Sequence, residues 1–176
     1  PLGSWMLHFL DMYTQYDLWI SHGEPKVMWL SGLGIPESYL TALVQTTCRA
    51  LNWPLDKATS STSVTAYTEV QQVPEKLAQG TYIRGLYLEG AGWDHKAMCL
   101  KRQEPKVLVV PLPIIEMIPI GGAMKLNGVF VTPVYVTQDR RNAMGVGLVF
   151  EANLASDEHV SVWVLQGVAL MLNTDT

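Results

Sequence analysis

The chain has 176 residues, of which 48% are hydrophobic and 16% are charged, and its formal net charge at pH 7 is −4. This composition excludes a disordered tail and fits one globular domain, because a polypeptide of this length buries roughly 70% of the surface that its unfolded form exposes. The basic residues are scattered and form no stripe, which argues against nucleic-acid binding. Six tryptophans and few charges indicate that some apolar surface meets a partner.

Several features bear on the compartment of the protein. Cys48 and Cys99 are far apart in sequence and suggest a reducing, cytoplasmic environment, with a single disulfide as the open alternative. The N-terminus has no basic region followed by an apolar run, so we expect no signal peptide, and residues 1–4 resemble the remnant of a cleaved purification tag. The longest apolar stretch, residues 107–120, contains three prolines and a glutamate and is too short for a membrane helix.

Two helices are expected at the start of the sequence. Residues 5–20 repeat apolar side chains every three or four positions, which predicts an amphipathic helix that ends at Gly23 and Pro25. Residues 36–51 repeat the same spacing, and Pro36 is well suited to the first helical turn. Residues 5–54 therefore form the predicted helical segment.

After residue 54 the sequence becomes typical of β-structure. Turn signals rich in glycine, asparagine and aspartate, including residues 139–142, separate the apolar runs. Strands are predicted near residues 60–70, 81–89, 106–110, 114–118, 129–137, 145–153 and 160–172. The predicted fold class is α+β, with two N-terminal helices packed on an antiparallel β-barrel of about six strands in residues 55–176, and a sandwich as the alternative.

The glycine-rich stretch of residues 85–94 resembles a phosphate-binding loop only superficially. Gly85 and Gly90 have the spacing of such a loop, but a lysine and a hydroxyl residue must follow the second glycine. Ala91 and Gly92 occupy those positions. We therefore expect these glycines to relieve a strand and turn the backbone, not to bind a nucleotide.

No set of side chains predicts catalysis or metal binding. His95 and Cys99 are four residues apart and could share a helix face, but no companion ligands stand at a matching spacing. The sequence has no G-x-S-x-G motif, although carboxylates from distant positions could still converge in the fold. We expect no catalytic residues, no metal and no cofactor, and the protein is predicted not to be an enzyme.

The tryptophans are the remaining functional signal. Trp5 and Trp19 fit the apolar face of the first helix, where packing in the core is the simpler interpretation. Trp29, Trp53 and Trp93 lie beside predicted loops, where they either pack against the barrel or anchor a partner.

Several motifs resemble the C-terminal domain of dynein heavy chains. They are residues 29–32 (WLSG) with Pro36 and residues 39–42 (YLTA), and then residues 80–94 (GTYIRGLYLEGAGWD). The later segments PVY and GVAL follow in the family's order, so the resemblance extends from residue 5 to the end of the sequence. Residues 86–94 are similar to the axonemal form, whereas Leu33 and Ile35 stand where the family usually has aromatic residues.

The resemblance implies a non-catalytic regulatory or structural domain of a microtubule-based, ATP-driven motor. In this family the domain lies across one face of a ring of AAA+ modules, which hydrolyses ATP, and microtubules bind elsewhere. The implied partners are the ring of the same heavy chain and the dynein complex, in the axoneme of a cilium or flagellum, with no direct contact to microtubule, membrane or nucleic acid. Candidate ring contacts are Trp5, Trp19, Trp29, Leu33, Ile35, Trp53 and Trp93.

Two further expectations follow. The isolated fragment should self-associate, because a surface intended for contact is exposed to water. The alternative function is a stand-alone β-barrel that binds a small ligand in its mouth, and it requires a pocket lined by several strands. A barrel interior filled by valine, isoleucine and leucine side chains would exclude that alternative.

Overall fold

The computed structural model describes residues 2–137 and 147–174, so the turn predicted at 139–142 lies outside the described residues. Its helices are α1 (Leu2–His22), α2 (Pro36–Leu51) and α3 (Val160–Gln166), with 3₁₀ turns η1 (Leu30–Gly32) and η2 (Val70–Gln72). Its strands are β1 (Val27–Trp29), β2 (Thr59–Val64), β3 (Thr81–Arg84), β4 (Tyr87–Glu89), β5 (Gly92–Asp94), β6 (Cys99–Lys101), β7 (Val109–Pro111), β8 (Ile115–Ile120), β9 (Val129–Tyr135), β10 (Leu148–Ala155) and β11 (Ala169–Met171).

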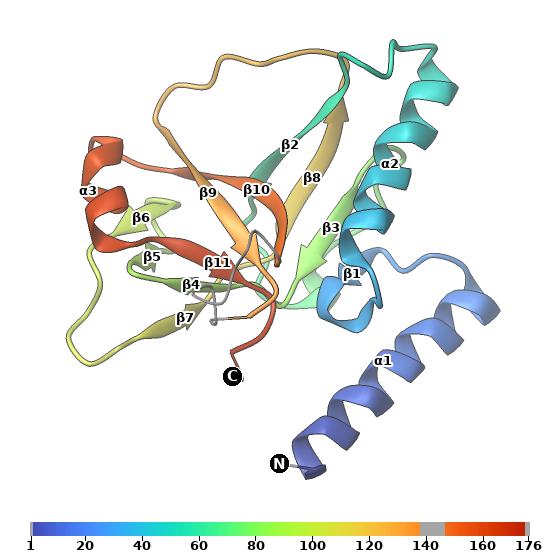
Figure 1. Cartoon of the computed structure of the whole chain (residues 1–176), viewed down its shortest axis with the longest axis horizontal. Coiled ribbons are helices and arrows are strands. Elements are labelled where there is room, and N and C mark those ends of the chain that lie inside the picture. Colours follow the sequence, from blue (N-terminus) through green and yellow to red (C-terminus); the bar gives the residue numbers. More distant parts are fainter. Residues whose placement is uncertain (1, 138–146, 175–176) are drawn as a thin grey trace.

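The described strands form two larger sheets and one small hairpin (Figure 1). One sheet has the order β1-β3-β8-β2, the other has the order β10-β9-β11-β4-β7, and β5 pairs with β6. The two larger sheets end at β2 and β10, where the Asn153 backbone N–H donates to Thr62 Oγ1 at 2.8 Å. The fold is therefore mixed α+β, as predicted, but its strand pairing does not establish the closed barrel.

The prediction of a purely antiparallel sheet is wrong at two places. β1 pairs with β3 in parallel, and β11 pairs with β9 in parallel. After the β9–β10 hairpin, the polypeptide crosses through α3 and returns on the other side of β9, in the direction of β9. The segments predicted to be helical also contribute a strand, because β1 forms the edge of the first sheet.

The glycines of residues 85–94 bend the backbone, as predicted. Gly85 separates β3 from β4 with φ +80°, and Gly90 follows β4 with φ +83°. A Cβ atom on Gly90 would lie 2.7 Å from the carbonyl oxygen of Gln166 at the end of α3. Both positions therefore need glycine for backbone conformation, and Gly90 also needs it for close packing.

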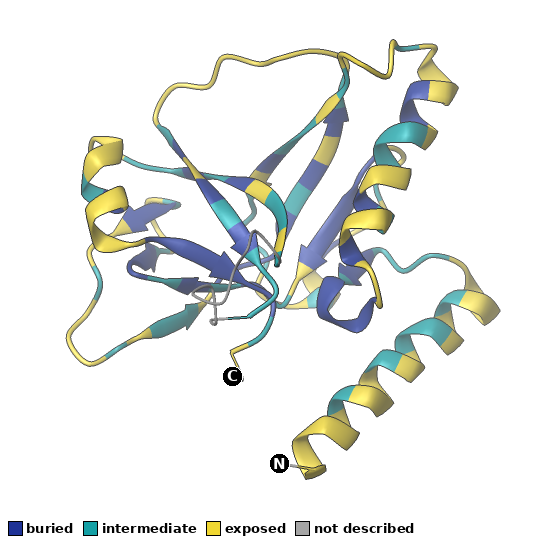
Figure 2. Ribbon diagram, viewed as in Figure 1, coloured by how far each residue is buried: buried dark blue, intermediate teal, exposed yellow. Residues whose placement is uncertain are grey.

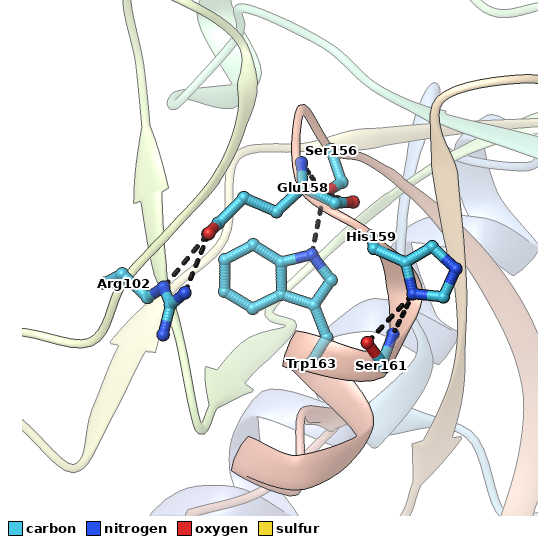
Figure 3. Close-up of polar contacts among 6 residues, drawn as sticks. All are labelled: Arg102, Ser156, Glu158, His159, Ser161 and Trp163. Carbon is cyan, nitrogen blue, oxygen red and sulfur yellow. Dashed lines mark hydrogen bonds and ion pairs between the residues drawn. The ribbon is translucent and has the colours of Figure 1, made fainter.

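The strand predicted over residues 160–172 is wrong in its first half, which forms α3. The β-branched residues of this segment favour a strand, but both of its ends carry helix caps. His159 accepts a hydrogen bond from the Ser161 N–H, and Gly167 takes the left-handed conformation that ends a helix. Trp163 is fully buried, and its indole N–H donates to Ser156 Oγ at 2.6 Å (Figure 3).

The core is filled by side chains of the two sheets together with side chains from η1, α3 and the loops. The largest fully buried side chains are Trp163, Met28, Leu30, Ile83, Leu86, Leu88, Ile115, Met117, Leu154, Leu170, Met171 and Val73. They occupy the space in which a small ligand would have to bind, so the alternative of a ligand in the barrel mouth gains no support. Figure 2 shows this buried centre, and it also shows that α1 is mostly exposed.

Candidate interaction surface

Helix α1 has an apolar surface that the rest of the described protein leaves uncovered. No residue of α1 is buried, which is unusual for a helix with this many large apolar side chains. The exposed ones are Leu2, Trp5, Met6, Leu7, Phe9, Leu10, Tyr13, Leu18 and Ile20. Soluble domains rarely leave a large contiguous apolar patch in water, so we assign this surface, the outer face of α1, as the candidate interaction surface.

The inner face of α1 rests on the body through partly buried side chains. Those that pack against the core are Tyr16 and Trp19. Trp5 is not a core residue, although its spacing groups it with Trp19: it is 63% exposed. The three-and-four spacing continues around more of the helix than one face, so sequence alone does not separate the inner side from the outer side.

Gln15 attaches α1 to the edge of the first sheet. Its side-chain Oε1 accepts a hydrogen bond from the Trp29 backbone N–H at 3.0 Å, and its Nε2 donates to the Trp29 carbonyl oxygen at 2.9 Å. Beyond η1, the Gly34 N–H donates to the Tyr16 hydroxyl at 2.9 Å. These bonds, together with the packing of Tyr16 and Trp19, fix the position of the helix.

The indole of Trp29 is the centre of this attachment. The His8 ring meets it edge-on with ring centroids 5.2 Å apart, and the Arg84 guanidinium lies 5.5 Å from its centroid. Trp29 and Arg84 are register partners on β1 and β3, which brings the cation over the aromatic ring. A Cβ atom on Gly85 would lie 2.8 Å from Trp29 Cδ1, so that glycine gives the indole its space.

A cleft of about 410 Å³ lies between α1 and the sheet beside Trp29. Its helix wall is formed by Asp11, Thr14, Gln15 and Leu18. Its other wall, called the sheet wall, is formed by Val27, Trp29 and Arg84 of β1 and β3, with Pro25 and Val70 beside them. Partial burial lowers the pKa of Arg84 from its ordinary value, while the charge of Asp11 acts in the opposite direction. The guanidinium remains charged at any physiological pH.

A second set of contacts holds the loop that joins α1 to β1. Tyr39 on α2 meets the ring of Trp19 edge-on, with centroids 5.8 Å apart, and its hydroxyl donates a short hydrogen bond to Glu24. Glu24 also forms an ion pair with Lys76 at 3.2 Å. Burial, followed by the hydrogen bond to Glu24, raises the pKa of Tyr39, so the phenol stays protonated and serves as a donor.

The structure separates the seven predicted contact residues into three groups. Trp5 and Ile35 are exposed, at 63% and 60%. Trp19, Trp29 and Trp53 are partly buried, and the ring of Trp53 lies against Gly121. Leu33 and Trp93 belong to the core at 8% and 4% exposure. Of the seven, only Trp5 belongs to the exposed apolar surface of α1, and burial removes Leu33 and Trp93 from any contact surface.

Sequence reasoning missed Gln15 and Arg84. Gln15 is a polar residue on the inner face of a helix, and Arg84 ends a buried strand. Neither belongs to a motif, and their importance depends on which parts of α1, β1 and β3 meet in space. One signal was present: a polar residue stands among Met12, Tyr16 and Trp19 where an apolar residue continues the pattern.

No cluster that could bind a metal occurs among the described residues. His95 is exposed and Cys99 is buried at the start of β6, so they do not share a helix face as their spacing allowed. The Cys99 thiol donates to Asp157 at 3.7 Å, and burial raises its pKa, which makes it a poor nucleophile. Both cysteines are free and buried.

The neighbourhood of α3 is held together by polar contacts (Figure 3). Arg102 donates two hydrogen bonds to the carboxylate of Glu158, at 3.0 and 2.8 Å, and this bidentate pair ties the segment after β6 to the start of α3. The His159 ring and the Ser161 hydroxyl, 2.9 Å apart, belong to the N-terminal cap of the same helix. These contacts have the geometry of structural support for α3.

No helix in the described part of the protein is long and apolar enough to cross a bilayer.

Comparison with known proteins identifies the kind of protein that carries this surface. The family model described as the C-terminal domain of the dynein heavy chain matches residues 1–172. The chain belongs to this family.

Its curated relatives are axonemal and flagellar heavy chains. The chain is 58% identical over 175 residues to dynein axonemal heavy chain 10 of Homo sapiens, and 61% identical over 175 residues to the dynein-1-alpha heavy chain of the flagellar inner arm I1 complex of Chlamydomonas reinhardtii. The dynein beta chain of the flagellar outer arm of the same alga is 39% identical. Each match spans at least 98% of this sequence but only 4% of the relative. These relatives place the protein with the axonemal dyneins of cilia and flagella.

Proposed function

We propose that this protein is a non-catalytic regulatory domain of an axonemal dynein heavy chain, an ATP-driven microtubule motor, and that it docks on the AAA+ ring of its own heavy chain. The observation that carries the proposal is the outer face of α1, whose large apolar side chains stay uncovered by the other described residues. Such a face stabilises an assembly when a partner buries it. Its position on a domain that makes up 4% of its relatives leaves the remainder of the heavy chain as the nearest partner.

Docking regulates the motor only when the contacts differ between ring conformations. Contacts that are equally strong in every nucleotide state add stability without changing the cycle, whereas contacts that favour one state shift the population towards it. The attachment of α1 through Gln15 and Tyr16, with little burial, suits such a role, because the helix can adjust to a moving partner without opening the core.

Residues 5–54 and 55–176 act as one unit, since β1, η1 and α2 contribute to the same hydrophobic core as the sheets. ATP hydrolysis and microtubule binding belong to other parts of the heavy chain, and this domain needs no cofactor. Separated from the ring, the domain self-associates through the outer face of α1.

Deletion of residues 5–176 from the heavy-chain motor tests the regulatory role. ATPase rate, gliding velocity and stall force should change, and three unchanged quantities would refute regulation. A finer test replaces Phe9 with Asp in the motor, which should weaken docking because a charge enters an apolar contact. Val164→Asp is the matched control, since Val164 is also exposed and apolar but lies on α3, at the far side of the domain from α1 (Figure 1).

A further inference from the structure

The cleft beside α1 carries opposite charges on its two walls. Asp11 belongs to the helix wall and Arg84 to the sheet wall. Asp11 and Gln15 are one helical turn apart on the same face. The two hydrogen bonds between Gln15 and the Trp29 backbone therefore also place the Asp11 carboxylate at the cleft. The pairing of Trp29 with Arg84 across β1 and β3 fixes the position of the opposite charge.

Neither charge is neutralised within the described part of the protein. The ion pairs found there include neither Asp11 nor Arg84, although the two groups sense each other's charge. The guanidinium is nevertheless positioned, since it lies over the Trp29 ring. A cation held in this way loses little side-chain entropy when it binds a carboxylate.

We propose that this cleft receives a segment of the docking partner that bears an acidic side chain beside a basic one, with the acidic group paired to Arg84 and the basic group to Asp11. The inference rests on the proposed function, because it assigns the recognition chemistry of the surface through which α1 docks. The apolar side chains of the surface supply burial, and the two charges select the partner and fix its register.

The apolar part of the cleft lining favours this chemistry. Val27, Trp29 and Leu18 are apolar, so a segment that fills the cleft displaces water from around both charges. Removal of water strengthens each ion pair relative to the same pair on an open surface. Leu18 belongs both to the exposed apolar surface of α1 and to the lining of the cleft, so a partner that covers that surface also reaches the cleft.

Hydrogen–deuterium exchange of the full heavy-chain motor tests the proposal. The readout is the exchange of the α1 amides in the motor, compared with the same amides in the isolated 176-residue protein. Arg84→Glu and Asp11→Lys should each accelerate α1 exchange in the motor by about tenfold, because the pair lost to the partner becomes a repulsion. Exchange in the isolated protein should change much less.

The doubly substituted variant, with Asp11→Arg and Arg84→Asp together, separates a partner from an internal ion pair. Recognition by a partner predicts that α1 exchange in this variant is at least as fast as in either single variant. Both reversed charges would then repel the partner charges that they face. Restoration of slow exchange would show that Asp11 and Arg84 pair with each other, and would overturn the proposal.

Two controls and one further outcome complete the test. Arg49→Glu and Asp56→Lys make the same charge changes at exposed positions outside the cleft and should leave α1 exchange unchanged. If the α1 amides of the wild-type motor are protected from exchange and those of the Arg84→Glu motor are protected equally, the cleft proposal fails while docking stands. If wild-type α1 is no better protected in the motor than alone, docking fails, and the cleft proposal fails with it.

Discussion

The side-chain amide of Gln15 pairs with both backbone groups of Trp29, accepting from its N–H at 3.0 Å and donating to its carbonyl at 2.9 Å. A neighbouring strand would make the same two bonds at that edge. Because β1 is the outer strand of its sheet, one helix residue therefore closes part of an edge that would otherwise stay open for pairing with another polypeptide.

Gln15→Glu should loosen α1 without unfolding the domain. The carboxylate can still accept from the Trp29 N–H, but its second oxygen faces the Trp29 carbonyl, so a hydrogen bond becomes a repulsion. We expect a loss of about 1–3 kcal/mol in local stability, measured as faster hydrogen exchange in α1. Gln71→Glu makes the same chemical change at an exposed position of η2 and should leave the exchange of α1 unchanged. Equal exchange in the two variants would contradict the role of Gln15.

Gly85→Ala should destabilise the whole domain. Gly85 has φ +80°, and its added Cβ would lie 2.8 Å from Trp29 Cδ1. The strained backbone and the displaced indole together should lower the free energy of unfolding by about 1–3 kcal/mol. Urea unfolding followed by fluorescence measures this difference.

Gly122→Ala provides the comparison for Gly85. No atom lies within 4 Å of the added Cβ at Gly122, so the substitution should change stability by less than about 0.5 kcal/mol. The comparison separates the need for glycine at position 85 from the general effect of a glycine-to-alanine substitution on stability. Similar losses at both glycines would show that the contact with Trp29 has little importance.

The isolated domain should self-associate through α1. Phe9→Asp places a charge in the exposed apolar face and should shift the protein towards the monomer, whereas Val164→Asp on α3 should not. Sedimentation velocity over a range of concentrations measures the equilibrium. A wild-type protein that stays monomeric at the highest concentration used would remove this expectation.

The pair of Arg102 and Glu158 predicts a dependence on pH. The side-chain hydrogen bonds from Arg102 hold the pKa of Glu158 below its ordinary value of 4.5. A lowered pKa in the folded state means that the pair stabilises the domain above about pH 4.5 and that this contribution is lost as the pH falls through the folded-state pKa. Because both groups are exposed, the contribution to stability is small.

A carboxyl titration by nuclear magnetic resonance is the direct measurement of this pair. Arg102→Gln should raise the pKa of Glu158 towards its ordinary value of 4.5. An unchanged pKa for Glu158 in Arg102→Gln would show that the bidentate pair does not persist in solution.

Local signals predicted part of this fold well. The helix expected over residues 36–51 is confirmed at both bounds, because Pro36 begins it and Asn52 ends it in a left-handed conformation. The segment at residues 160–166 could not be assigned in this way, since its β-branched residues favour a strand and only the caps and the burial of Trp163 make it helical. Tertiary contacts outweighed local propensity there.

The candidate surface was predictable only in outline. The abundance of tryptophan and the low charge indicated an apolar contact surface, and Trp5 and Ile35 are exposed as such a surface requires. Leu33 and Trp93 show the limit of this reasoning, because position beside a predicted loop does not determine whether a side chain turns inward. The contacts of Gln15 and Arg84 depend on the juxtaposition of α1, β1 and β3, which no local pattern encodes.

The attachment of α1 also has a mechanical consequence. Gln15 fastens the helix about 20 Å from its first residue and about 10 Å from its last, at 1.5 Å per residue. A rigid rod pinned there is a lever with unequal arms, and its longer arm is the end that carries Trp5 and Phe9. A force applied at that end acts on the Gln15–Trp29 attachment with about twice the lever arm of an equal force at the other end.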